Sequence, residues 1–139
     1  MTGVAIVTGA AGGLGKEIVL GLAGAGYDIV AADRDADALH GLGVPAHPVR
    51  ADLTTHDDLD AIVAAARELG GPHVLVNCAG GWTSERHYPD APPDEWLAAV
   101  TLNLTAPMAL ALLAIRAMRD LGGGAIVNVA STAGLGAEP

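Results

Sequence analysis

The sequence of 139 residues contains very few lysines, aromatic residues and cysteines. Lys16 is the only lysine, phenylalanine is absent, and there are two tryptophans, two tyrosines and one cysteine. Seven basic residues against 16 acidic ones give a formal net charge of −9. This charge argues against a surface for nucleic acid or anionic membranes, because both require clustered Lys and Arg. The single cysteine, Cys78, excludes an intrachain disulfide and fits a reducing compartment.

The sequence also offers little that resembles a targeting or membrane segment. An apolar strand is expected almost at Met1, which leaves no room for a signal or transit peptide. The longest apolar stretch of the second half is interrupted by Arg116 and Arg119, so we expect it to be too short to cross a bilayer. We therefore expect a cytoplasmic protein with no membrane partner.

What the sequence does contain is an alternation of apolar strands and amphipathic helices, with apolar residues making up 51%. Strands are predicted at Val4–Thr8, Asp28–Ala32, about Val44–Arg50, His73–Cys78 and Ala125–Ala130. Helices are predicted at about Leu14–Ala25, Asp35–Leu42, Leu59–Leu69 and Asp94–Arg119. Strands that lack polar alternation are covered on both faces, which predicts a parallel, doubly wound α/β sheet. Right-handed crossovers favour the Rossmann-like strand order 3-2-1-4-5 in one domain over residues 1–139.

The turn after the first predicted strand is rich in glycine. The strand stops at Thr8, and four of the next seven residues are Gly9, Gly12, Gly13 and Gly15. Bare backbone N–H groups at the start of a helix favour an anion, which predicts a site for a nucleotide pyrophosphate. A tight G-x-G-x-x-G fingerprint is excluded by Ala11, and a P-loop is excluded by Ala10 and Glu17. A glycine-rich turn that binds nothing is the alternative.

Asp33 closes the second predicted strand. An acid at this place accepts both hydroxyls of an adenosine ribose and repels a 2′-phosphate, so NAD is favoured over NADP. Arg34 is able to accommodate that phosphate, which keeps NADP as the less favoured alternative. A solvated helix start is the other interpretation of Asp33 and the acids at Asp35 and Asp37.

The spacing Thr8-Gly9-x-x-x-Gly13-x-Gly15 resembles the short-chain dehydrogenase/reductase family. Asp52-Leu53 resembles the family's pair that caps the adenine ring, although a loop Asp that caps the next turn is an equal alternative. The run Asn77–Gly80 resembles the family's Asn-Asn-Ala-Gly signature, with Cys78 in the second position as a small buried residue rather than a nucleophile. The cofactor contacts that the resemblance implies are Thr8, Gly9, Gly13, Leu14, Gly15, Asp33, Arg34, Asp52, Leu53, Asn77, Ala79 and Gly80.

Two further residues match the family's catalytic positions. Asn103 lies inside the long predicted helix, where we expect a buried amide, and it matches the Asn that holds a water of the proton relay. Ser131 follows the fifth strand and matches the Ser that binds the substrate oxygen. The resemblance thus implies hydride transfer between a nicotinamide and a carbonyl or alcohol carbon of a small molecule. The histidines show no metal-ligand spacing, so no metal site is expected.

The family's Tyr-x-x-x-Lys motif is missing from this sequence. Tyr27 is followed four residues later by Ala31 and Tyr88 by Pro92, while the only lysine is Lys16. The resemblance therefore covers only the N-terminal part of the family's usual length, before the last strands of the sheet. We expect this chain to bind cofactor at most, to show no turnover, and to self-associate through the exposed edge of its fifth strand.

Two other functions fit parts of the pattern. A non-catalytic nucleotide-binding or interaction module would use the same glycine turn and Asp33. A methyltransferase with a similar turn is disfavoured by Asn77–Gly80 together with Ser131. The irregular segment Gly80–Pro93 is expected to supply part of a pocket wall, but the substrate itself is beyond the sequence.

Overall fold

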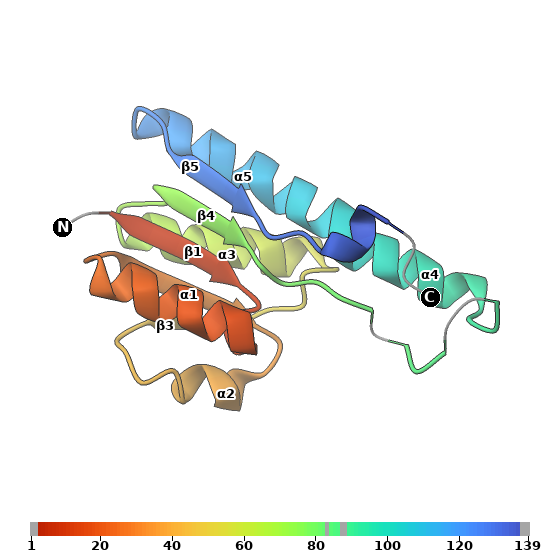
Figure 1. Cartoon of the computed structure of the whole chain (residues 1–139). Helices are drawn as coiled ribbons and strands as arrows, with labels where there is room; N and C mark the ends of the chain where they lie inside the picture. The colour runs from red at the N-terminus through yellow and green to blue at the C-terminus, as the bar shows by residue number, and fades with distance from the viewer. Residues whose placement is uncertain (1–2, 83, 87–88, 137–139) are drawn as a thin grey trace.

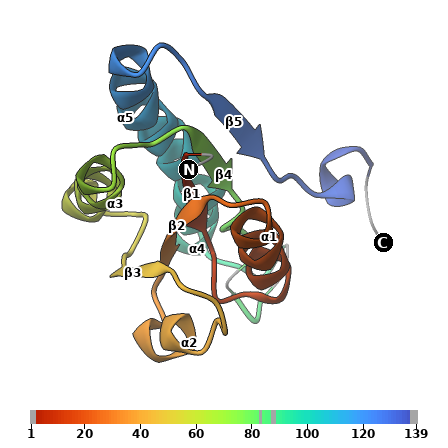
Figure 2. The ribbon, with the colours of Figure 1, turned by 90° about the vertical axis from the view of Figure 1, so that its left-hand side faces the viewer.

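A computed structural model describes residues 3–82, 84–86 and 89–136 as a parallel five-stranded sheet with helices on both faces (Figures 1 and 2). The strands are β1 (Val4–Thr8), β2 (Asp28–Asp33), β3 (His47–Arg50), β4 (Val74–Asn77) and β5 (Ala125–Asn128). Their order is β3-β2-β1-β4-β5, and every pairing is parallel. The predicted Rossmann-like fold class and strand order are confirmed.

Helices lie on both faces of the sheet. They are α1 (Gly13–Gly24), α2 (Ala36–His40), α3 (His56–Glu68), α4 (Pro93–Val100) and α5 (Ala106–Asp120). Figure 2 shows α3 and α5 on one face and α1 on the other. The inner strands β1, β2 and β4 therefore bury side chains in both directions, whereas the edge strands β3 and β5 do not.

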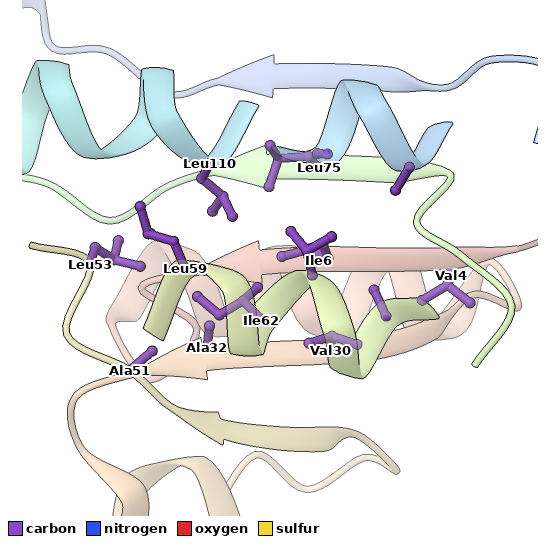
Figure 3. Packing of buried hydrophobic residues seen from close by; sticks show 14 of the residues in the cluster. Val4, Ile6, Val30, Ala32, Ala51, Leu53, Leu59, Ile62, Leu75 and Leu110 are labelled. Atoms are coloured by element: carbon purple, nitrogen blue, oxygen red, sulfur yellow. The ribbon is translucent and has the colours of Figure 1, made fainter. Parts of the chain in front are cut away.

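Two apolar cores result from this arrangement. Ile6, Val30 and Leu75 are buried under α3 and α5, where Figure 3 shows them facing Ile62 and Leu110. On the opposite face Val7, Ile29 and Val76 belong to a second core. Val19 of α1 and Leu39 of α2 complete that second core. Because consecutive residues of β1 alternate between the cores, the carboxyl end of β1 is held between two packed layers.

The long helix predicted over residues 94–119 spans α4 and α5, but it is not uniform. A π-helical turn, Thr101–Thr105, lies between them, and the Ala106 amide donates to the Thr101 carbonyl. Pro107 has no amide hydrogen, so it cannot donate to the Asn103 carbonyl four residues earlier. The wider turn fits this missing donor, and such turns often mark functional sites.

The length of this helix differs from the expectation that it is too short to cross a bilayer. From Pro93 to Asp120 it is 28 residues long, with an 18-residue window of mean hydropathy 1.9 that is 17% buried. Arg116 and Arg119 therefore do not make it too short to cross a bilayer, and that expectation is wrong. Length and composition alone are weak evidence for a span, because core helices of soluble proteins pass the same test. Here Leu110 and Ala114 are fully buried in the core beside α3.

Several predicted boundaries shift by a few residues. Strand β3 begins at His47 rather than near Val44, and β5 ends at Asn128 rather than Ala130. Helix α3 starts at His56, three residues before Leu59, because Thr55 is its N-cap and acids fill its first turn. Strand β5 lies at one edge of the sheet order, and its Val127 is 50% exposed.

Candidate cofactor and active site

The glycine turn between β1 and α1 is packed so closely that two of its positions admit only glycine. Gly9 has φ +64°, and a Cβ there would lie 2.9 Å from the backbone of Ala79. A Cβ at Gly15 would collide with the carbonyl oxygen of Gly9. The amide of Gly12, the N-cap of α1, donates to that same carbonyl at 3.1 Å. The turn is therefore a compact lead into the N-terminus of α1, where an anion is favoured.

A cleft of about 590 Å³ opens over this turn at the carboxyl ends of the strands. Ten of the expected cofactor-binding residues line it: Gly9, Gly13, Leu14, Gly15, Asp33, Arg34, Asp52, Leu53, Ala79 and Gly80. Ala98 and Leu102 also line it, from α4 and the π turn. No sequence motif marks these two residues, because their place in the cleft depends on how the long helix packs across the sheet.

The carboxylate of Asp33 reaches back to the glycine turn. Its Oδ2 accepts the Ala11 amide at 3.0 Å, and its Oδ1 accepts the Asp35 amide at 3.1 Å. An ionised carboxylate has about four acceptor sites, so capacity remains for hydroxyl donors. Arg34 is exposed and lines the same cleft. The acid and the arginine on which the choice of cofactor depends thus lie side by side.

Asp52 caps a turn at the rim of the same cleft. Its Oδ1 accepts the amide and the hydroxyl of Thr54 at 2.9 and 2.7 Å. The hydrogen bond from the Thr54 amide, then that from its hydroxyl, holds the pKa of Asp52 below its ordinary value, with smaller contributions from Arg34 and Arg50. Burial opposes this shift. The turn-capping interpretation of Asp52 describes its contacts, and Asp52 also lines the cleft.

Thr8 lies below the clefts rather than in them. It is 1% exposed, and its hydroxyl accepts the amides of Cys78 and Ala79 at 3.1 and 3.2 Å. Neither of the two large clefts found among the described residues is lined by Thr8. Thr8 therefore shapes the cleft wall by joining β1 to the chain that follows β4.

A second cleft, of about 760 Å³, lies beside the first. It brings together Asn103 and Ser131, the two expected catalytic residues, with Asn77. Ala79 and Gly80 line both clefts, as does Cys78, so these residues form their common wall. Cys78 is half-buried rather than buried, and burial raises the pKa of its thiol.

Asn103 is exposed, so the expectation of a buried amide is wrong. Its Oδ1 accepts the Gly81 amide at 2.7 Å, and its Nδ2 donates to the carbonyls of Gly81 and Ala99 at 2.9 and 2.8 Å. The π turn presents this side chain to the loop that follows β4. The amide is stabilised by these hydrogen bonds rather than by burial, which the sequence could not distinguish.

Asn77 joins three elements at the floor of the second cleft. It is 4% exposed, and its Nδ2 donates to Asn128 Oδ1 at 2.9 Å and to the Pro107 carbonyl at 3.4 Å. Asn77 and Asn128 are register partners in β4 and β5. Asn128 was not predicted as a site residue, although a polar side chain in an apolar strand could have indicated it.

The loop after β4 is attached to the start of α4. The Ser84 hydroxyl and the Arg86 guanidinium both bind the Glu95 carboxylate. The Ser84 hydrogen bond, more than the Arg86 charge, lowers the pKa of Glu95. His87 and Tyr88 of this loop lie outside the described residues. Among the residues that the structure describes, no group of three or more His, Cys, Asp or Glu is placed to hold a metal ion.

A glycine turn at a helix start, an acid at the end of the neighbouring strand and a cleft over both are features of a Rossmann-like α/β domain. Comparison with known proteins narrows this class. The family model described as short chain dehydrogenase matches residues 3–139. The chain belongs to the short-chain dehydrogenase family.

Three similar proteins illustrate the relationship. The 7alpha-hydroxysteroid dehydrogenase of Escherichia coli (strain K12) is 36% identical over 137 residues, which cover 93% of this chain and 53% of that protein. A solved structure of 7 alpha-hydroxysteroid dehydrogenase with NADH and 7-oxo glycochenodeoxycholic acid has a TM-score of 0.88 at 34% identity, covering 98% of this chain and 56% of that one. L-sorbose reductase from Gluconobacter frateurii, with NADPH and L-sorbose, has a TM-score of 0.87 at 34% identity, covering 96% and 54%. The chain thus spans about half the length of the relatives it matches.

Proposed function

We propose that these 139 residues act as one NAD-binding domain of a short-chain dehydrogenase/reductase. In such an enzyme a hydride passes between the nicotinamide and a carbonyl or alcohol carbon of a small-molecule substrate. The observation that carries the proposal is the single cleft lined by Gly9, Gly13 and Gly15 together with Asp33. It offers backbone N–H groups to a pyrophosphate and a carboxylate to a ribose in one continuous space.

NAD is proposed over NADP because the Asp33 carboxylate lies in this cleft, and its negative charge would repel a 2′-phosphate. Arg34 lines the same cleft and supplies the opposite charge. Related structures contain NADH in one protein and NADPH in another. The proposed preference for NAD therefore rests on Asp33 of this chain. We expect NAD to bind more tightly than NADP.

Ser131 and Asn103 are proposed to serve the substrate side, in the second cleft. The Ser131 hydroxyl would donate to the oxygen of the carbonyl or alcohol group. The Asn103 side chain is committed to Gly81 and Ala99, so its backbone carbonyl would hold the relay water. Pro107 supports this assignment because it cannot donate an amide hydrogen to that carbonyl.

We propose that this chain binds NAD without measurable turnover. The general acid/base and the cation beside it would have to come from a Tyr and a Lys four residues apart. These 139 residues contain no such pair. A non-catalytic nucleotide-binding module is the second candidate function, and it would use the same cleft with its glycine turn and Asp33. Turnover by the purified chain would contradict both the module and the proposed inactivity.

Self-association is proposed for the isolated chain, in a cytoplasmic setting that suits its free thiol. Strand β5 pairs only with β4 among the described strands; its Val127 is exposed, as is Val129 directly after it. An apolar edge with unpaired backbone groups invites pairing with another chain. No membrane partner is proposed, because buried residues of α5 such as Leu110 pack in the core.

Titration of NAD and NADP against thermal unfolding tests the proposed function. Binding to the native state alone stabilises it by about 2.7 kcal/mol at a ligand concentration of about 100 Kd. We expect a rise in Tm with NAD and a smaller rise with NADP at equal concentration. S-adenosylmethionine serves as the control nucleoside ligand and is expected to have no effect. An unchanged Tm with both dinucleotides would overturn the proposal.

A further inference from the structure

The side chain of Asp33 lines the first cleft and also binds the glycine turn. Its Oδ2 accepts the amide of Ala11, which lies in the middle of the turn, at 3.0 Å across 22 residues of sequence. The contact is partly buried, so the hydrogen bond is less exposed to competing water than a surface pair. A charged acceptor makes it stronger than a neutral one.

The backbone around Asp33 is fixed from three directions. The Ala10 amide donates to the Ala32 carbonyl at 3.2 Å, and the Ala51 amide donates to the Asp33 carbonyl at 2.9 Å. The second carboxylate oxygen accepts the Asp35 amide at 3.1 Å. The carboxylate thus has a defined orientation, with one oxygen on the turn and one on the start of α2.

The middle of the turn has little other support. Gly9 and Gly15 are held by close packing, but a Cβ at Gly13 would meet nothing within 4 Å. Gly12 and Gly13 are also exposed. The bond from Ala11 to Asp33 is therefore one of two hydrogen bonds that hold the turn to β2, with that from Ala10 to Ala32, and it is the one nearer the start of α1.

We propose that Asp33 is a positioning residue for the pyrophosphate-binding turn, in addition to its role as the ribose acceptor. This inference rests on the proposed function, because the turn is taken as the pyrophosphate site. A carboxylate is required because two amides, those of Ala11 and Asp35, donate to two different oxygens. An Asn side chain has only one carbonyl oxygen and would present an amide group to one of these donors.

This role makes a prediction that ribose recognition alone does not make. A negative charge beside an anion site opposes anion binding, so removing a purely ribose-binding acid would leave pyrophosphate affinity unchanged or improve it. If Asp33 orders the turn, removing it weakens binding of an anion that has no ribose. Replacing Asp33 to admit a 2′-phosphate would then weaken the turn that NADP also needs.

The experiment compares the wild type, Asp33→Ala and Asp33→Asn by amide hydrogen exchange and by titration with ADP and with inorganic pyrophosphate. We expect amide exchange over residues 11–15 to accelerate about tenfold or more in Asp33→Ala, the factor expected for loss of one hydrogen bond to a charged group. Amides of β4 and β5 should exchange as in the wild type. Pyrophosphate affinity should fall in both variants, and ADP affinity should fall further.

Asp37→Asn is the matched control, because it removes one negative charge from the nearby first turn of α2. It should leave exchange in the glycine turn and both affinities unchanged. Unchanged exchange at Ala11 in Asp33→Ala, or unchanged or tighter pyrophosphate binding, would overturn the positioning role. Failure of the wild type to bind ADP would instead contradict the proposed function, while the exchange data still decide the role of Asp33.

A measurement on the wild type covers the case in which both variants fail to fold. In a pH titration followed by NMR, the Ala11 amide proton should shift with the same midpoint as the carboxyl carbon of Asp33. The amide of Gly21, inside α1, is the internal control. An Ala11 amide that does not respond to protonation of Asp33 would refute the contact.

Discussion

Asn103 and Gly81 are joined by a reciprocal pair of hydrogen bonds, with the side-chain amide of one paired to the backbone of the other. Asn103 Oδ1 accepts the Gly81 amide at 2.7 Å and its Nδ2 donates to the Gly81 carbonyl at 2.9 Å. The adjacent Gly80 is required as well, because a Cβ there would lie 2.8 Å from Asn103 Oδ1. The loop after β4 is therefore attached to the π turn directly between the two clefts.

Asn103→Ala should lower the free energy of unfolding by about 1–2 kcal/mol, because it leaves the Gly81 amide and carbonyl without their partner. Urea unfolding measures this difference. Leu104→Ala is the neighbouring control: the Leu104 side chain is 56% exposed, so its loss should cost less than about 0.5 kcal/mol. Equal losses of unfolding free energy in the two variants would show that the hydrogen bonds between Asn103 and Gly81 do not stabilise the fold.

Gly15→Ala should destabilise the chain by about 3 kcal/mol, at the upper end for an added methyl group, and abolish the NAD-dependent rise in Tm. The added Cβ would collide with the Gly9 carbonyl, which is backbone and cannot rotate away. Gly21→Ala is the control in the same helix, because a Cβ there meets nothing within 4 Å. It should raise stability by about 0.5–1 kcal/mol through helix propensity. A Gly15→Ala variant that still responds to NAD would contradict the packing argument.

Asp52 should contribute to stability in a pH-dependent way. Since its pKa is lowered in the folded chain, chiefly by the Thr54 hydrogen bonds, its contribution is present above the ordinary pKa of Asp and is lost as pH falls through the lowered value. Asp52→Asn should therefore lose less Tm than the wild type between about pH 6 and about pH 3. The difference will be modest because the group is largely solvated. An equal loss of Tm in Asp52→Asn and in the wild type would contradict this contribution of Asp52.

Cys78 should react slowly with iodoacetamide. Burial raises the pKa of its thiol, so less thiolate is present at about pH 8 than for a free cysteine. The alkylation rate of the folded chain should be lower than that of the same chain in urea. NAD should slow it further, because Cys78 lines both clefts. A folded chain that reacts as fast as the unfolded one would contradict this environment for the thiol.

Much of the fold could be predicted because it depends on local patterns. The apolar runs of β1 and β2 and the glycines after Thr8 specify strand, turn and helix in order, and the handedness of crossovers then restricts the topology. Asp33 was recognisable because it ends a strand next to that turn. These features need no knowledge of contacts between distant residues.

The contacts that the sequence did not reveal are those between residues that lie far apart along the chain. Each of three hydrogen-bonded pairs joins residues more than 20 positions apart: Asp33 with Ala11, Asn103 with Gly81, and Asn77 with Asn128. The π turn fits the missing amide donor of Pro107 together with side-chain hydrogen bonds to the helix backbone. Neither feature alone would predict a π turn from the sequence. Thr8 shows the converse case: this polar residue of the glycine motif does not line the cleft, and its hydroxyl instead holds Cys78 and Ala79 of the cleft wall.

The position of β1 in the middle of the sheet has a consequence for protein synthesis. Its two neighbours, β2 and β4, lie on either side of it and are made at different times. A nascent chain that has emerged through β3 would contain both the glycine turn and Asp33 but would lack Ala79, which packs behind Gly9. Nucleotide binding on the ribosome should therefore begin only after β4 has been translated, even though every glycine of the turn was made at the outset.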